Sequence, residues 1–246
     1  NSIYFPQLLV LAKESTSDSF TSGCILLYAV IVNKTSEINP DFLKEEVLAP
    51  LFEIYDAAKK KPIKQSSKII RKIIISVGEL AYFIASSPVS IGFPKSTGEL
   101  FLEALKSNDP CTRHYAIRSI SNILTTTRYD EILNLAKLEK AVNEFENDDE
   151  QPNMFDTYVI CLVLIYTKKA VDEKYKSNIE DLIRKLLTTN SSTARTMGII
   201  LSAATNTLSN FQSELESVNN NSIGELKSKA LLTMCLIYEN DIKGFS

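Results

Sequence analysis

Apolar residues recur at helical spacing along most of the chain. The clearest stretch carries apolar side chains at positions i, i+3, i+4 and i+7, namely Ile69, Ile70, Ile73, Ile74, Val77, Leu80, Ala81 and Ile84. These positions share one face of a helix with 3.6 residues per turn. The pattern therefore predicts an amphipathic helix over 65–86, with Ser66 and Ser67 as candidate capping residues and Ser87-Pro88 as its end.

The same spacing predicts further helices. They fall at 4–13, 20–33, 41–59, 96–106, 111–127, 130–145, 154–169, 173–188, 191–208 and 223–239. Short polar connections separate them. The β-branched run 25–32 has no neighbouring strand pattern with which to pair, so we expect a buried helix there as well. With only 7 Gly and 8 Pro, the chain lacks the tight turns of a sandwich or barrel, and an all-α fold is expected.

Similar helical segments return at a nearly constant interval. Glu79, Asn122, Leu164 and Asn206 stand at matching positions that are 43, 42 and 42 residues apart. A period of about 40–47 residues, built from two or three helices, is typical of HEAT and armadillo repeats. We therefore predict an armadillo/HEAT-like α-solenoid of about five to six helical repeats, forming a single domain over 1–246. Because the chain begins at Asn1 without Met, we expect it to be a fragment of a longer protein.

Two stretches resemble a known group of repeat tails. The stretch 109–124, DPCTRHYAIRSISNIL, resembles the opening of a HEAT or armadillo helix. Its core RHYAIRSISNI and the earlier stretch 71–86, RKIIISVGELAYFIAS, are similar to the repeat tail of Fused-related, Unc-51-like kinases and pseudokinases. The chain departs from that pattern at Arg113, where Gln is usual, and at Arg118-Ser119, where Lys-Thr is usual.

The resemblance implies a non-catalytic scaffold that follows a kinase-like domain. It further implies a cytoplasmic protein at the cytoskeleton or cilium, acting in cytokinesis or ciliary regulation, with microtubule-associated or kinesin-type protein partners. The chain itself contains no Gly-rich loop, catalytic-loop HRD or DFG motif, so we do not expect it to transfer phosphate.

Charge and cysteine usage exclude several other classes. The net charge is −3, whereas a nucleic-acid binder usually carries a basic excess, so nucleic acid is not an expected partner. The 4 cysteines are far apart and form no CxxC pair, which argues against a disulfide framework or a zinc site. No apolar run reaches 18 residues, so no membrane span is expected.

Candidate chemistry is sparse. His114 is the only histidine, so every His-dependent nucleophilic site would have to use it, and we expect a structural role at a helix start. The acidic run from Glu144 to Glu150 has no EF-hand spacing and is expected to be a solvated loop, with a cation or basic partner as the alternative. We predict no catalytic, cofactor-binding or metal-binding residues, and hence no enzyme.

The remaining candidates are polar residues on repeated helices. In armadillo proteins, which this chain resembles, an Asn near the end of the third helix lines a groove and binds the backbone of an extended peptide. Asn122 and Asn206 stand at that repeated position, while Glu79 and Leu164 interrupt the series. The alternative is a surface Asn that has no partner or that caps a neighbouring loop.

Basic residues supply the other candidate binding groups. Arg113 and Arg118 lie on one predicted helix and are expected to pair with an acidic partner or with a neighbouring repeat. Lys59, Lys60 and Lys61 form a cluster that is either a solvated helix end or a contact for an acidic surface. The predicted function is a protein-interaction scaffold. The alternative is an adaptor, or a chaperone or transport cofactor, that binds a client protein or a linear peptide.

Overall fold

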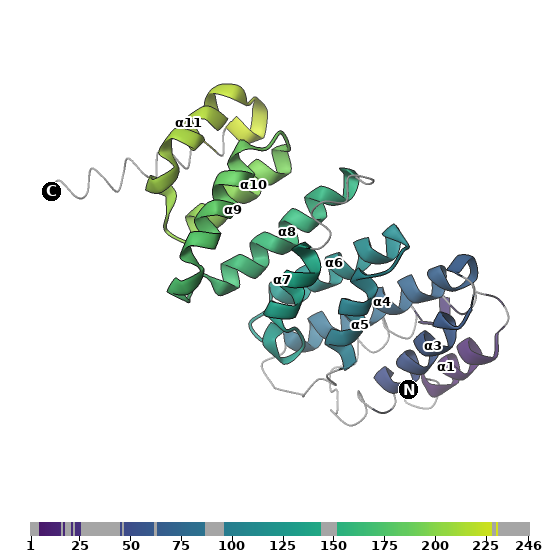
Figure 1. Cartoon of the computed structure of the whole chain (residues 1–246). Coiled ribbons are helices and arrows are strands. Elements are labelled where there is room, and N and C mark those ends of the chain that lie inside the picture. The colour runs from purple at the N-terminus through teal and green to yellow at the C-terminus, as the bar shows by residue number, and fades with distance from the viewer. Residues whose placement is uncertain are drawn as a thin grey trace. The chain divides into compact units, whose positions relative to one another are not determined.

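In the computed structural model, every element of regular secondary structure in the described parts of the chain is a helix. Those parts are residues 5–15, 17, 21, 23–25, 45, 47–61, 63–86, 96–143, 152–227 and 230. The chain divides into two compact units, Asn1–Phe145 and Glu146–Ser246, whose elements are labelled in Figure 1. The prediction that 1–246 folds as one domain stays a prediction.

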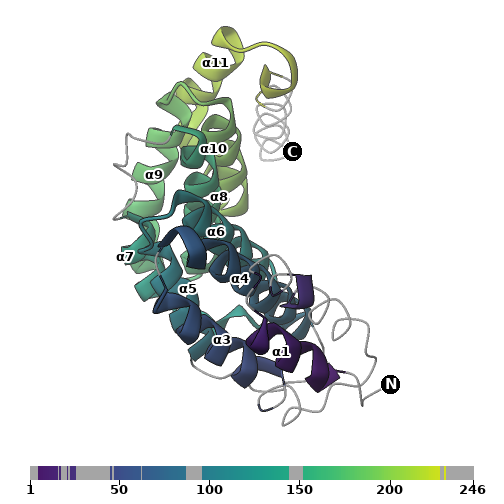
Figure 2. The same cartoon turned by 90° about the vertical axis from the view of Figure 1, so that its right-hand side faces the viewer.

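The first unit is a two-layer stack of helices. Its elements are α1 (Phe5–Glu14), α3 (Ala49–Lys59), α4 (Ile63–Ala85), α5 (Ser96–Leu105), α6 (Pro110–Leu124), a 3-10 helix η2 (Tyr129–Glu131) and α7 (Leu135–Asn143). The helices α4 and α6 pack side by side in one layer, and α3 and α5 cover them from the other. The second layer continues with α1 against α3 and α7 against α5, as Figure 2 shows.

The second unit repeats this plan with different elements. It contains α8 (Pro152–Lys169), the 3-10 helix η3 (Glu173–Tyr175), α9 (Lys176–Thr188), α10 (Ser192–Ala204), the 3-10 helix η4 (Leu208–Phe211) and α11 (Gln212–Asn221). In it α8 packs against α10, α9 covers α10, and α11 lies against α9.

Amphipathic sequence explains why these segments are helical and which way they face. Along α4 the fully buried apolar positions are Ile73, Ile74, Val77, Leu80 and Ala81, with Ile84 almost fully buried. Each large aliphatic side chain removed from water contributes about 1.5–3 kcal/mol. A helix pair that buries only one such face needs neighbours to cover the rest, which is why repeats of this kind stack.

The repeat period follows this alternation of layers. Three of the four matched segments of the sequence lie inside α4, α6 and α8, so one period is one helix of each layer. The described helices supply such pairs as α3–α4 and α5–α6 in the first unit and α9–α10 in the second, and α7 and α8 follow one another between them along the chain. Helices α1 and α11 stand where a further pair would begin, in keeping with the predicted five to six repeats.

Several predicted boundaries are wrong for local reasons. Helix α4 begins at Ile63, so Ser66 and Ser67 lie inside the helix and do not cap it. The predicted helix 130–145 begins only at Leu135, since the side-chain oxygen of Asn134 accepts from the backbone N–H of Lys137 at 3.1 Å.

Helix α11 was missed, because 212–221 is mostly polar. It buries only Leu215 and Val218, with Phe211 buried just before it. Much of the predicted helices 20–33 and 223–239, part of 41–59 and the acidic run at 144–150 lie outside the described residues.

Candidate functional site

Helices α4 and α6 each expose one stripe of side chains opposite their buried face. These residues, here called the α4/α6 face, are Lys68, Lys72, Ile75, Glu79 and Tyr82 on α4 and Cys111, Tyr115, Arg118 and Asn122 on α6. In each helix they recur at i, i+4, i+7 and i+11, which places them on a single side. Because the two helices are side by side, we treat the two stripes as one surface.

A glycine sets the close approach of the two helices. A Cβ atom placed on Gly78 of α4 would lie 2.5 Å from the Cβ atom of Ser119 on α6 and 2.2 Å from its Oγ atom. The hydroxyl of Ser119 also donates to the backbone carbonyl of Ile74 at 3.5 Å. The absent side chain at position 78 thus allows the contact that fixes the spacing of the α4/α6 face.

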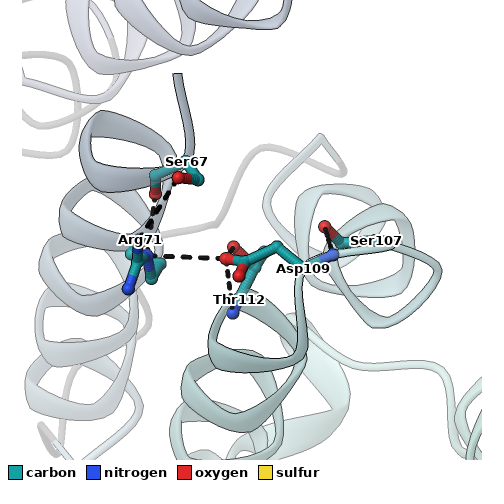
Figure 3. Close-up of polar contacts among 5 residues, drawn as sticks. All are labelled: Ser67, Arg71, Ser107, Asp109 and Thr112. Carbon is teal, nitrogen blue, oxygen red and sulfur yellow. Dashed lines mark hydrogen bonds and ion pairs between the residues drawn. The ribbon is translucent and has the colours of Figure 1, made fainter. Parts of the chain in front are cut away.

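A polar network ties the same helices together near their N-terminal ends (Figure 3). The Nε atom of Arg71 on α4 lies 3.5 Å from the carboxylate of Asp109, and it donates to the carbonyl of Ser67 at 3.0 Å. Asp109 is the N-cap of α6, because its side chain accepts from the backbone N–H of Thr112 at 3.0 Å and from the Thr112 hydroxyl. The backbone N–H of Asp109 donates to the hydroxyl of Ser107 at 3.1 Å. One carboxylate therefore caps α6 and positions α4 against it.

The α4/α6 face combines charged, amide and apolar groups. Lys72 and Arg118 form no ion pair with any residue that the structure describes, and Arg118 is exposed. Ile75 and Tyr115 are half-buried between them. The side-chain amide of Asn122, also half-buried, makes no hydrogen bond within the described part of the chain and retains two donors and an acceptor. This surface can bind carboxylates, apolar side chains and peptide groups.

Arg113, expected to pair with an acidic partner or with a neighbouring repeat, is buried and binds the connection before its own helix. It is only 8% exposed, and its guanidinium donates to the carbonyl of Ser107 at 2.9 Å. In the second unit Arg195 does the same, donating to the carbonyl of Thr189 at 2.6 Å. Each arginine follows its helix N-cap by four residues, the caps being Asp109 and Ser191.

These two arginines belong to a repeated motif that the sequence reading missed. The stretches 107–113, SNDPCTR, and 189–195, TNSSTAR, share the form [ST]-N-[DS]-x-x-x-R and stand 82 residues apart. The arginine binds the carbonyl two residues before the N-cap, which closes the connection between two helices. A search for repeats of hydrogen-bonding residues, in addition to apolar ones, would have found it.

The motif also corrects the pairing of the two asparagines. With a spacing of 82 residues the counterpart of Asn122 is Ala204, the last residue of α10. Asn206 lies beyond the helix, exposed, with φ of 54°. Asn tolerates this left-handed conformation better than most residues, so Asn206 ends α10. Asn122 lies within α6 and contributes to the α4/α6 face.

The lysine cluster lies at the end of α3, away from the α4/α6 stripe. Lys59 pairs with Glu103 of α5 and lies 5.2 Å from the ring centre of Tyr55. Burial raises the pKa of Tyr55, and the neighbouring carboxylate of Glu103 raises it further. Lys60 and Lys61 are exposed, and Lys61 lines a shallow pocket of about 350 Å³ beside α1. Lys59 therefore links the α3 and α5 helices, whereas its two neighbours face solvent.

Within the residues that the structure describes, we find no cluster of side chains suited to catalysis. The imidazole of His114 meets the ring of Tyr115 edge-on, with centroids 5.6 Å apart and planes at 74°. Among the described residues no three His, Cys, Asp or Glu side chains are placed to hold a metal ion, and Cys24, Cys111 and Cys161 are free thiols. No described helix has the length and apolar character needed to cross a membrane.

Comparison with known proteins identifies the fold. No protein-family model and no curated protein sequence matches the chain. A crystallised engineered protein from a structural genomics consortium superposes with a TM-score of 0.58 and 12% identity, covering 96% of each chain. A designed armadillo repeat protein, YIII(Dq)4CqI, superposes with a TM-score of 0.56 and 14% identity over 93% of this chain and 98% of its own. At such low identity the likeness concerns architecture alone, and it confirms the predicted all-α, armadillo/HEAT-like repeat fold.

Proposed function

We propose that this chain is a non-catalytic protein-interaction module that binds its partner across the α4/α6 face. The observation that carries the proposal is a solvent-facing surface on two helices held in fixed register, with three polar side chains that make no ion pair or hydrogen bond within the described chain. Asn122, Lys72 and Arg118 supply these groups. The Gly78–Ser119 approach and the Arg71–Asp109 contact set their spacing before any partner arrives. A pre-positioned surface loses less conformational entropy on binding.

The size of the face favours a linear segment as the bound element. From Lys68 to Tyr82 the stripe runs about 20 Å along the helix, at about 1.5 Å per residue. Two helices with axes about 9 Å apart, each about 10 Å across with its side chains, give a width of about 20 Å. The area of the face is therefore ~400 Å². A standard interface between folded proteins buries about 800 Å² on each side. An extended peptide laid across α4 and α6 therefore matches this area better than a whole folded domain does, which favours the adaptor form of the function.

A display selection tests the proposal. A random twelve-residue peptide library is selected on the immobilised chain, and the selected peptides are assayed against the double variant Ile75→Ala/Asn122→Ala. We expect enriched peptides that lose binding to this variant. They should still bind the matched control Val171→Ala/Asn178→Ala, which removes equivalent groups at exposed positions of the second unit. Enrichment of no peptide, or equal binding to both variants, would refute the use of this face.

A finer proposal is that the chain is the repeat tail of a Fused-related, kinase-like regulator at the cytoskeleton or cilium. It rests only on the likeness of the stretches 71–86 and 113–123, which lie in α4 and α6. The full-length gene tests it directly, since a kinase-like domain must precede the repeats. Co-sedimentation with polymerised microtubules tests the partner, and a chain that stays in the supernatant would contradict that part.

A further inference from the structure

Charge differs between two pairs of helices in the first unit. The described side chains of α4 and α6 include five cations and one carboxylate, namely Lys68, Arg71, Lys72, Arg113, Arg118 and Glu79. Those of α3 and α5 show the reverse, with Glu53, Asp56, Glu99 and Glu103 against Lys59. Because the whole chain carries a net charge of −3, this cationic layer is a local feature.

Two of these cations already serve the fold. Arg71 pairs with Asp109, and Arg113 is buried against the connection before α6. Lys72 and Arg118 form no ion pair with a described residue, and both lie on the α4/α6 face. An anionic partner would therefore meet two cations there whose charge no described carboxylate offsets at close range.

The exposed carboxylates of α3 and α5 act in the same direction. Lys13 pairs with Glu53 and Lys59 with Glu103, which leaves Asp56 and Glu99 exposed without an ion pair among the described residues. An acidic segment would meet these two carboxylates along α3 and α5, whereas on the α4/α6 face it meets two cations without an ion pair.

The spacing of the two cations constrains the ligand. Gly78 lies against Ser119, so Lys72 and Arg118 differ by five residues in register. On helices about 9 Å apart this separates their backbones by about 12 Å. An extended chain advances about 3.3 Å per residue. Carboxylates two to four positions apart are therefore within reach of both side chains. Ile75 and Tyr115 lie between the cations and contact apolar parts of the same segment.

We propose that the α4/α6 face recognises an acidic linear segment of a partner protein, with its carboxylates on Lys72 and Arg118 and its backbone on Asn122. This inference rests on the proposed function and specifies the partner chemistry of the same face. Nucleic acid fits less well, since Glu79 interrupts the stripe and the chain as a whole repels a polyanion. A membrane surface would engage a broad array of lysines, whereas these cations are set among half-buried side chains.

Fluorescence anisotropy with three labelled peptides tests the inference. Each has Gly-Ser ends around four alternating pairs of a polar residue and Leu, and the polar residue is Glu, Gln or Lys. The protein is the full chain, the double reversal Lys72→Glu/Arg118→Glu, or the matched reversal Lys106→Glu/Lys140→Glu. The matched reversal alters the net charge equally at exposed positions outside the face. Circular dichroism confirms that each variant keeps its helix content.

The expected result is a preference of about tenfold for the Glu peptide over the Gln peptide, weakening as salt rises. The double reversal removes or inverts this preference, and the matched reversal keeps it. The inference is overturned if none of the peptides binds, if the Gln peptide binds as tightly, or if both reversals act alike. Binding of a single-stranded oligonucleotide or phosphatidylserine vesicles in place of the Glu peptide also overturns it.

The display selection separates the two levels of the argument. If face-dependent peptides are enriched without acidic residues, the proposed function stands and the acidic preference is wrong. If no face-dependent peptide is enriched, the proposed function itself fails.

Discussion

Replacing Gly78 by alanine sets two effects of opposite sign against each other. In the interior of a helix, alanine is favoured over glycine by about 1 kcal/mol, since glycine loses more backbone entropy on folding. By that effect alone Gly78→Ala in α4 stabilises the protein. The new methyl group, however, would lie 2.5 Å from the Cβ atom of Ser119 on α6.

The contact decides the sign. Carbon atoms in ordinary contact are about 3.5–4.0 Å apart, so the two helices must separate by about 1 Å at this point. Overpacking of this kind costs about 1–3 kcal/mol. Once the gain in helix propensity is subtracted, we expect the free energy of unfolding to fall by up to about 2 kcal/mol. For a chain of this size each kcal/mol lowers Tm by roughly 2–4 °C.

Thermal and urea unfolding followed by circular dichroism measure this change. The control is Gly23→Ala, since no atom lies within 4 Å of a Cβ placed on this exposed helical glycine, and it should stabilise by up to about 1 kcal/mol. The rescue is Gly78→Ala/Ser119→Gly, which removes the opposing side chain and should recover much of the loss caused at α4. A Gly78→Ala variant more stable than the natural chain would refute the reasoning on how α4 and α6 approach.

Three further outcomes follow from the structure. Arg113→Ala and Arg195→Ala should each lower the free energy of unfolding in urea by about 1.5–3 kcal/mol, because each removes a charge-assisted hydrogen bond. A loss below ~0.5 kcal/mol for either variant would show that this arginine does not close its connection. Asn206 has a φ of 54°, which glycine adopts more easily and alanine less easily than asparagine does. Asn206→Gly should therefore stabilise the protein by several tenths of a kcal/mol and Asn206→Ala should destabilise it. The reverse order would contradict the left-handed conformation at the end of α10. The carboxylate of Glu214 accepts a hydrogen bond from Ser213 and pairs with Arg184, and both contacts lower its pKa. The charged carboxylate therefore stabilises the folded protein fully above about pH 4.5, and this contribution is lost as pH falls through the lowered pKa. Glu214→Gln should therefore lower Tm at pH 7, and the difference should shrink below pH 4.5; a gap independent of pH would exclude the charge as its cause.

The apolar pattern alone determined the class of the fold. The spacing of Ile69, Ile73 and Val77 specifies a helix with one buried face, and the recurrence of such faces specifies a stack. The stretch 109–124 resembles the opening of a HEAT or armadillo helix, and Asp109 does cap α6. These features depend on neighbours within a turn or two of helix, and a sequence displays such neighbours directly.

Roles that depend on distant neighbours were decided by the tertiary structure. Arg113 reads as a surface cation but is buried against Ser107, and Asn206 reads as a groove residue but ends a helix. Arg113 and Arg118 are five positions apart and point about 140° apart around α6, so the rotation of this helix against its neighbours decides which one remains available. That rotation is set by contacts between helices, such as Gly78 against Ser119. Residues that are 41 positions apart carry no mark in the sequence that they will touch. The chain's own pattern thus determined the stack of helices, whereas packing between helices decided which side chains remain for a partner.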